Sequence, residues 1–158
     1  MKRHSSLRET EQAIIDAACE LLERRLRRQH HRHTEVFDTP DEAATYFQLK
    51  LSGQEREVFA GIFLDNKCRM LRYEEFFYGT VDGCAAHPRE ILKVALACNA
   101  ACLIVGHNHP SGVPEPSVED RQATRRIGDA LKLVDVRLLD HIIVGHDTWF
   151  SFSRNGMV

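Results

Sequence analysis

The sequence predicts a mixed α/β fold, in which helices cover both faces of a central sheet. Two short apolar runs, residues 58–64 and 101–105, are typical of buried strands, and residues 136–144 predict a further strand of the sheet. Segments with apolar residues at helical spacing lie before and between these runs. With 158 residues, 43% hydrophobic and 28% charged, the chain is long enough to form one globular domain with a substantial core.

The N-terminal segment predicts an amphipathic helix over residues 7–28. Ser6 and Glu9 have the spacing of a capping box at its start. Its apolar positions share one helical face, and they are Ile14, Ile15, Ala18, Leu21, Leu22 and Leu26. This apolar face is expected to pack on the rest of the domain or on a second copy of the chain, which would make a homo-oligomer. Residues 29–38 are interpreted as a polar linker.

A helix and a hairpin are predicted next. Pro40 stands at the first position of a helix that Gly53 ends. The apolar run 58–64 forms the first strand of the hairpin. Residues 65–67 then turn the chain into a second strand over residues 68–78.

The second half of the chain predicts alternating helices and strands. Pro88 opens a helix that stops at Asn99. The strand over residues 101–105 places His107 just past its carboxyl end, where ligand sites of open α/β sheets are found. The remaining expected elements are a helix from Ser117 to Leu133 and strands over residues 136–144 and 149–152.

Charge is unevenly distributed, although the net charge is only −2. Residues 1–33 carry eight Lys/Arg and five Asp/Glu, whereas the remainder carries thirteen and eighteen. The basic residues gather where the first helix ends, and they are Arg24, Arg25, Arg27, Arg28 and Arg32, with His30, His31 and His33 among and after them. We interpret this cluster as complementing the helix dipole, with a nucleic-acid or partner surface as the alternative.

The composition indicates a cytoplasmic protein with reduced cysteines. Its five cysteines are an odd number and lack the density of a disulfide scaffold. Cys98 and Cys102 are interpreted as small core residues rather than as a zinc-binding pair. No apolar run reaches membrane-spanning length and no secretory signal opens the chain, so no membrane association is expected.

One stretch contains residues suited to metal chemistry, namely HNHPSG at His107–Gly112 followed by Ser117 and Asp120. Histidines two residues apart point the same way in an extended chain, and imidazole is a common zinc ligand. Asp120 can supply a third ligand, which leaves a fourth position for water, as in catalytic zinc sites. The pattern therefore predicts one zinc ion (Zn²⁺) per chain, bound by His107, His109 and Asp120.

The spacing His-x-His, seven residues, Ser, two residues, Asp resembles the JAMM motif of JAB/MPN metalloproteases. The flanking sequence is similar to the RadC-type branch of that family. The matching segments are HNHPSG at 107–112, PSVED at 116–120, LLDHIIVG at 138–145, FLD at 63–65 and HPRE at 87–90. We therefore expect a RadC-type JAB/MPN domain over residues 35–158, preceded over residues 1–34 by the helix and a basic linker.

The resemblance implies a zinc-dependent metallopeptidase, a hydrolase acting on a peptide or isopeptide substrate. In this family a glutamate at the start of an upstream strand is the general base, and Glu57 holds the matching position. Glu55, Glu74 and Glu75 are rivals, but none of them directly opens that strand. By the same analogy, Ser117 would donate a hydrogen bond to the oxyanion of a tetrahedral intermediate.

Three other polar residues near the motif have less specific interpretations. Ser111 is interpreted as a loop former, and Asn108 is expected to point away from the metal ligands. His141 follows Asp140 at a strand start. We interpret His141 as structural, with a contact to a ligand from behind as the alternative.

RadC-type proteins have also been linked by name to DNA repair. The longer members carry an N-terminal region that resembles a helix-hairpin-helix. Here a single helix and a basic linker are predicted instead, with no glycine-containing hairpin. A nucleic-acid-binding or scaffold module with a structural metal is therefore the less favoured alternative to a metallopeptidase.

Overall fold

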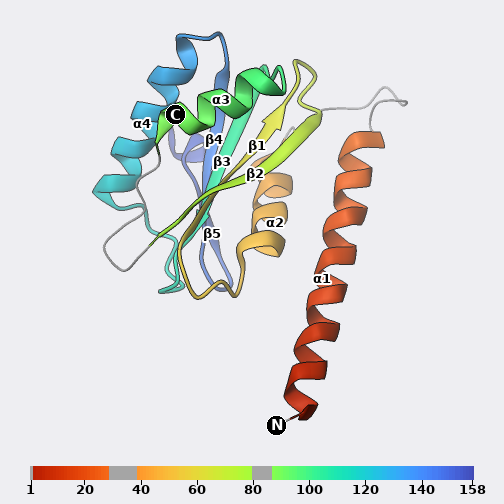
Figure 1. Cartoon of the computed structure of the whole chain (residues 1–158). Coiled ribbons are helices and arrows are strands. Elements are labelled where there is room, and N and C mark those ends of the chain that lie inside the picture. The colour runs from red at the N-terminus through yellow and green to blue at the C-terminus, as the bar shows by residue number, and fades with distance from the viewer. Residues whose placement is uncertain (1, 29–38, 80–86) are drawn as a thin grey trace.

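The computed structural model describes residues 2–28, 39–79 and 87–158, with the side chains of the first helix described over residues 11–24. It has the mixed α/β architecture that the sequence predicts (Figure 1). The helices are α1 (Lys2–Arg28), α2 (Pro40–Leu51), α3 (Pro88–Ala97) and α4 (Val118–Lys132). The strands are β1 (Val58–Leu64), β2 (Met70–Tyr78), β3 (Cys102–Asn108), β4 (Arg137–Val144) and β5 (Trp149–Ser151), followed by a short 3₁₀ helix over Ser153–Asn155.

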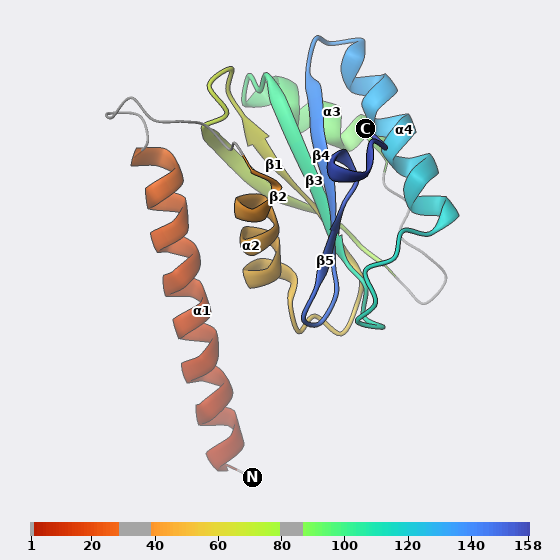
Figure 2. The same ribbon diagram turned by 180° about the vertical axis from the view of Figure 1, so that it is seen from behind.

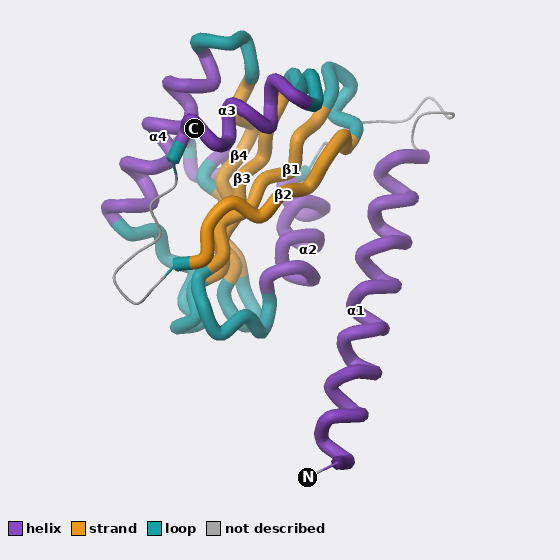
Figure 3. The backbone as a smooth tube through the Cα atoms, viewed as in Figure 1, coloured by secondary structure: helices purple, strands orange, loops and turns teal. Residues whose placement is uncertain are grey.

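A five-stranded sheet in the order β2-β1-β3-β4-β5 forms the middle layer (Figure 3). Its β3–β4 pair is parallel and is joined by α4, whereas the other three neighbouring pairs are antiparallel. Figures 1 and 2 show α2 against one face of the sheet and α3 and α4 against the other. The site described below therefore stands on a central parallel pair that is supported from both sides.

The burial of β1 shows why the sheet occupies the centre of the core. All seven of its residues are buried, because β2 and β3 flank it and helices cover both faces. Ile62 joins the apolar cluster under α2, together with Phe47 of that helix. The next residue, Phe63, joins the opposite cluster with Ile91 of α3 and Ile127 of α4. This alternation follows from the two-residue period of a strand.

Helix α1 packs beside α2 through its C-terminal part, while its N-terminal part extends past the sheet (Figure 1). Leu22 contacts the apolar cluster under α2. The Tyr46 hydroxyl donates a hydrogen bond of 2.7 Å to Glu23. Ile14 and Leu21 remain 65% exposed, so the apolar face of α1 packs on its own domain only in part.

Several element boundaries differ from the sequence expectation, and two of them lie in the first half of the chain. Helix α1 begins at Lys2, so Ser6 lies inside the helix and the capping box predicted there is wrong. Strand β2 begins at Met70 rather than at Cys68. Cys68 has a φ of 53° in a turn that the Asp65 carboxylate holds by accepting backbone hydrogen bonds, so it cannot continue a strand.

Part of the predicted N-terminal basic region lies outside the described residues, including the linker 29–34 and the side chains of Arg25, Arg27 and Arg28. Cys84 also lies outside them, and the other four cysteines are free thiols. Among the described helices, none combines the length and the apolar composition needed to cross a membrane.

Candidate metal centre

The first two donor residues stand at the end of β3. The strand continues to Asn108, beyond the apolar run, so His107 lies within the strand and its expected place past the end is wrong. Pairing explains the extension, because His107 lies opposite Phe59 of β1 and Ile143 of β4 and is fully buried there. His109 follows the strand directly. The Nε2 atoms of the two histidine rings are 3.0 Å apart, as expected for side chains pointing the same way.

The third donor comes from the first turn of α4. Ser117 is the N-cap and forms a capping box with Asp120. Its Oγ accepts the Asp120 N–H at 3.0 Å, and the Asp120 carboxylate accepts the Ser117 N–H at 2.8 Å and its hydroxyl at 2.5 Å. The same carboxylate lies 3.2 Å from His107 Nε2 and 3.5 Å from His109 Nε2. The helix start thus points Asp120 at both histidines.

The loop between β3 and α4 fixes the ring of His109. His109 Nδ1 lies 2.8 Å from the Val113 carbonyl oxygen. Because a carbonyl oxygen can only accept a hydrogen bond, Nδ1 carries the proton. In the neutral ring, Nε2 then keeps its lone pair. The loop is held against the turn after β4, because the His146 N–H donates to the Gly112 carbonyl at 3.1 Å. A Cβ at Gly145 would overlap that carbonyl oxygen, so glycine permits the close approach.

His107 is held from behind by His141 of β4. His107 Nδ1 lies 2.8 Å from His141 Nε2, and His141 Nδ1 lies 2.6 Å from the Thr124 hydroxyl of α4. The Thr124 hydroxyl donates to the Asp120 carbonyl at 2.6 Å. His141 has no exposed surface, and Phe152 stacks on it with 4.7 Å between the ring centroids. A buried chain of polar atoms therefore runs from the donor helix α4 to the donor strand β3.

Charge within the site shifts the pKa values of its groups. Burial would raise the pKa of Asp120, but the interactions of its carboxylate with the His107 and His109 rings outweigh burial and hold that pKa well below its usual range. The bond to Asp120 raises the pKa of His109 against the effect of burial, and the charge of Glu57 acts in the same direction. Burial lowers the pKa of His141 well below its usual value. Near neutral pH, Asp120 is therefore an anion and His141 is uncharged.

Glu57 lies directly before β1 and is half-buried. In the β1–β3 register Phe59 pairs with His107, so continuing the antiparallel pairing by two residues places Glu57 opposite His109. The contribution of the Glu57 charge to the pKa of His109 agrees with this placement. The Glu57 carbonyl accepts the Gly79 N–H at 2.7 Å, which ties the segment to the end of β2.

Asn108 holds the backbone on both sides of Glu57. Its side-chain Oδ1 accepts the Val58 N–H at 2.8 Å, and its Nδ2 donates to the Arg56 carbonyl at 3.0 Å. The Asn108 side chain therefore points away from the metal donors, as expected, and toward the strand entry that carries Glu57.

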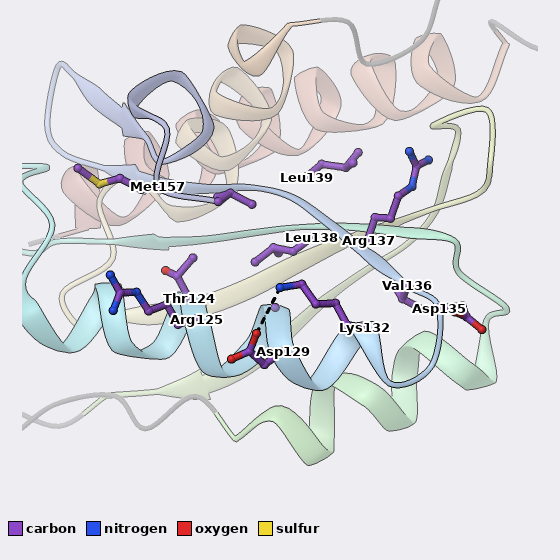
Figure 4. A pocket seen from close by; sticks show the side chains of 12 residues that line it. Thr124, Arg125, Asp129, Lys132, Asp135, Val136, Arg137, Leu138, Leu139 and Met157 are labelled. Atoms are coloured by element: carbon purple, nitrogen blue, oxygen red, sulfur yellow. Dashed lines mark hydrogen bonds and ion pairs between the residues drawn. The ribbon is translucent and has the colours of Figure 1, made fainter.

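A separate hollow of about 670 Å³ lies between α4 and β4 (Figure 4). Its lining includes Thr124 from α4 and Leu138 from β4, with Lys132 paired to Asp129 at 3.3 Å. None of the three metal donors lines this hollow. A smaller hollow of about 140 Å³ is lined by His109, but not by His107 or Asp120.

The structure brings together the three ligands that the sequence predicts, His107, His109 and Asp120, with ligand atoms within 4.8 Å of one another. It places His141 in contact with His107, which is the alternative interpretation of that residue. Thr124 was not anticipated. Its spacing of four residues after Asp120 indicates only that the two residues share one face of α4, and not that Thr124 contacts His141.

Comparison with known proteins agrees with the motif and the fold. A family model described as RadC-like JAB domain matches residues 37–157. A UPF0758 protein of Vibrio cholerae serotype O1 is 46% identical over 96% of this chain and 92% of its own length. A UPF0758 protein of Coxiella burnetii is 47% identical over 99% of this chain and 70% of its own length. A UPF0758 protein of Xanthomonas euvesicatoria is 49% identical over 90% of this chain and 63% of its own length. The chain belongs to the family of RadC-like JAB domain proteins.

Proposed function

We propose that this protein is a zinc-dependent hydrolase that cleaves a peptide or isopeptide bond. The observation that carries the proposal is the convergence of two imidazole nitrogens and one carboxylate within 4.8 Å. Nitrogen donors favour zinc over magnesium or calcium, which prefer oxygen ligands, and three protein ligands leave a position for water. A zinc ion in such a site supplies Lewis acidity and lowers the pKa of water toward about 7.

Glu57 is the residue that we assign to proton transfer. It is half-buried at the start of β1, and Asn108 fixes the peptide groups on either side of it. The rival glutamates are less suitable. Glu55 is exposed, Glu74 is bound by an arginine, and Glu75 accepts hydrogen bonds from two tyrosines. As general base, Glu57 would accept a proton from the attacking water and pass it to the leaving nitrogen.

Ser117 is the residue that we assign to the developing oxyanion. Its hydroxyl bonds to the Asp120 carboxylate in the capping box, and rotation about its Cβ–Oγ bond redirects the proton. A preorganised donor of this kind contributes on the order of 3 kcal/mol to transition-state stabilisation. The capping bond from the Asp120 N–H to Ser117 Oγ keeps the hydroxyl oxygen in place during such a rotation.

The metal assignment predicts about one zinc ion per purified chain, bound through three protein ligands. His107→Ala and His109→Ala should each lose the metal, as measured by elemental analysis after dialysis against a weak chelator. His87→Ala is the matched control, because His87 is exposed and lies outside the donor triad. Full zinc occupancy in the His107→Ala/His109→Ala double variant would disprove the assignment.

The base assignment predicts that Glu57→Gln keeps the zinc and the fold but loses hydrolysis, because the proton acceptor is gone while the ligands remain. The assay is a screen of linear peptides and Lys-linked isopeptides with the zinc-loaded protein. Glu55→Gln is the matched control, since it removes an exposed carboxylate two residues away. Wild-type turnover in Glu57→Gln would move the role to another residue, and no turnover by the wild type across the screen would count against the proposed hydrolase.

A further inference from the structure

We propose that Thr124 and His141 are positioning residues that orient His107 so that its Nε2 lone pair faces the metal. The proposal rests on the metal site of the proposed function, but it does not require that the site be hydrolytic. Neither residue is a metal donor, and both lie behind His107 on elements that support the site.

The direction of the hydrogen bonds follows from the single proton of the Thr124 hydroxyl. Its oxygen lies 2.6 Å from the Asp120 carbonyl and 2.6 Å from His141 Nδ1. A carbonyl oxygen can only accept, so the hydroxyl proton belongs to that contact. The proton in the second contact must then come from His141 Nδ1. In the reverse arrangement, the hydroxyl and carbonyl oxygens would meet at 2.6 Å with no proton between them.

This direction sets the tautomers of both histidines. A neutral imidazole with its proton on Nδ1 has an acceptor at Nε2. His141 Nε2 therefore accepts from His107 Nδ1 across 2.8 Å. His107 then holds its own proton on Nδ1, and its Nε2 presents a lone pair toward His109 and Asp120. Metal-binding histidines commonly need such a partner for the second ring nitrogen, and here the partner is another histidine.

The surroundings hold the His141 ring at a fixed angle. Phe152 stacks on one side of it, and Phe59 meets it edge-on with 5.5 Å between the ring centroids. The backbone N–H of His141 donates to the buried Asp140 carboxylate at 2.7 Å, and that carboxylate also accepts the Ser151 hydroxyl at 2.6 Å. His141 is therefore fixed both at its ring and at its backbone, as a positioning residue requires.

The test compares zinc affinity, measured by competition with a chromophoric chelator, in three variants. Thr124→Val removes the hydroxyl with little change of shape and should weaken zinc binding by about 10-fold to 100-fold, as loss of an outer partner does in other metal sites. Thr124→Ser restores the hydroxyl and should bind within about 3-fold of the wild type, since only a methyl group is lost. Thr45→Val is the matched control, because the Thr45 hydroxyl makes the same bond to the carbonyl four residues earlier, at 2.8 Å, on α2.

Thermal unfolding of each metal-free variant shows whether a change in affinity reflects loss of the fold. If Thr124→Val does not fold, two-bond ¹H–¹⁵N spectra of the zinc-loaded wild type decide the question. They should show the proton on Nδ1 of both His107 and His141. A proton on Nε2 of His141, or equal zinc affinity in Thr124→Val and Thr45→Val, would overturn the proposal. Absence of peptidase activity would leave it standing, whereas absence of zinc binding would overturn it together with the proposed function.

Discussion

Asn108 lies between two metal donors in the sequence but acts on the opposite side of the strand. His107 and His109 face the candidate metal site, while the Asn108 side chain reaches β1 and binds the peptide groups that flank Glu57. One three-residue segment thus fixes two candidate metal donors and the position of the candidate base. This requires an amide at position 108, because the Val58 N–H needs an acceptor and the Arg56 carbonyl needs a donor.

Asn108→Ala should lower the free energy of unfolding by about 1–3 kcal/mol, because the N–H of the buried Val58 would lose the acceptor that Asn108 supplies. Urea denaturation of the metal-free protein measures this loss. Asn66→Ala is the matched control, since Asn66 is exposed in a turn, and it should change stability by less than about 0.5 kcal/mol. Equal unfolding midpoints for the two variants would contradict the role of Asn108.

The residues of the site differ in how visible they are in the sequence. The donor set His107, His109 and Asp120 can be found because its spacing lies within one short segment. Thr124 and His141 cannot be assigned in this way, because their contact forms only when α4 packs against β4. Chain order shows which elements follow one another, but it does not show which side chains meet between them.

At the level of the elements, the loop between β3 and α4 depends on the turn after β4. The Gly112 carbonyl accepts the His146 N–H, and the Val113 carbonyl next to it orients the His109 ring. Gly145 lies directly under the loop, and a Cβ there would overlap the Gly112 carbonyl oxygen. We therefore expect a side chain at position 145 to displace the loop and, through it, the candidate metal donor His109.

Gly145→Ala should destabilise the protein by about 1–3 kcal/mol through overpacking. It should also weaken zinc binding, because the Val113 carbonyl would no longer meet His109 Nδ1. Gly128→Ala is the contrasting variant. Gly128 lies inside α4, and a Cβ there would be in ordinary contact with Leu138 of β4 at 3.7 Å. The higher helix propensity of alanine should therefore stabilise the protein by up to about 1 kcal/mol. Thermal unfolding and zinc competition on both variants measure these effects, and a neutral Gly145→Ala would contradict the close approach.

The boundaries of the elements show where sequence patterns stop being sufficient. β1 matches its prediction over residues 58–64, because its apolar run coincides with the paired segment. β3 continues through His107 and Asn108, since neighbouring strands and a distant backbone segment supply partners for these polar residues. An apolar run therefore marks the buried part of a strand, whereas pairing determines its full length.

At the scale of the whole molecule, charge and apolar surface are distributed unequally between the N-terminal helix and the domain. Residues 1–33 carry an excess of three positive charges, and residues 34–158 carry an excess of five negative charges. Helix α1 is attached to the domain through Leu22 and the bond from Tyr46 to Glu23. Its exposed residues Ile14 and Leu21 leave an apolar strip that its own domain does not cover.

This distribution predicts that the basic end of α1 does not bind DNA at physiological salt. Arg24 is exposed and pairs with Glu20, and the acidic domain repels a polyanion. A gel-shift titration at about 50, 100 and 150 mM salt tests this prediction. When binding neutralises Z phosphates, the logarithm of the binding constant falls with the logarithm of the salt concentration, with a slope near −0.9Z. We expect weak binding at the lowest salt only. Retention of DNA at about 150 mM, lost when Arg24, Arg25, Arg27 and Arg28 are all changed to Ser, would instead establish a phosphate-binding surface at this end of the helix.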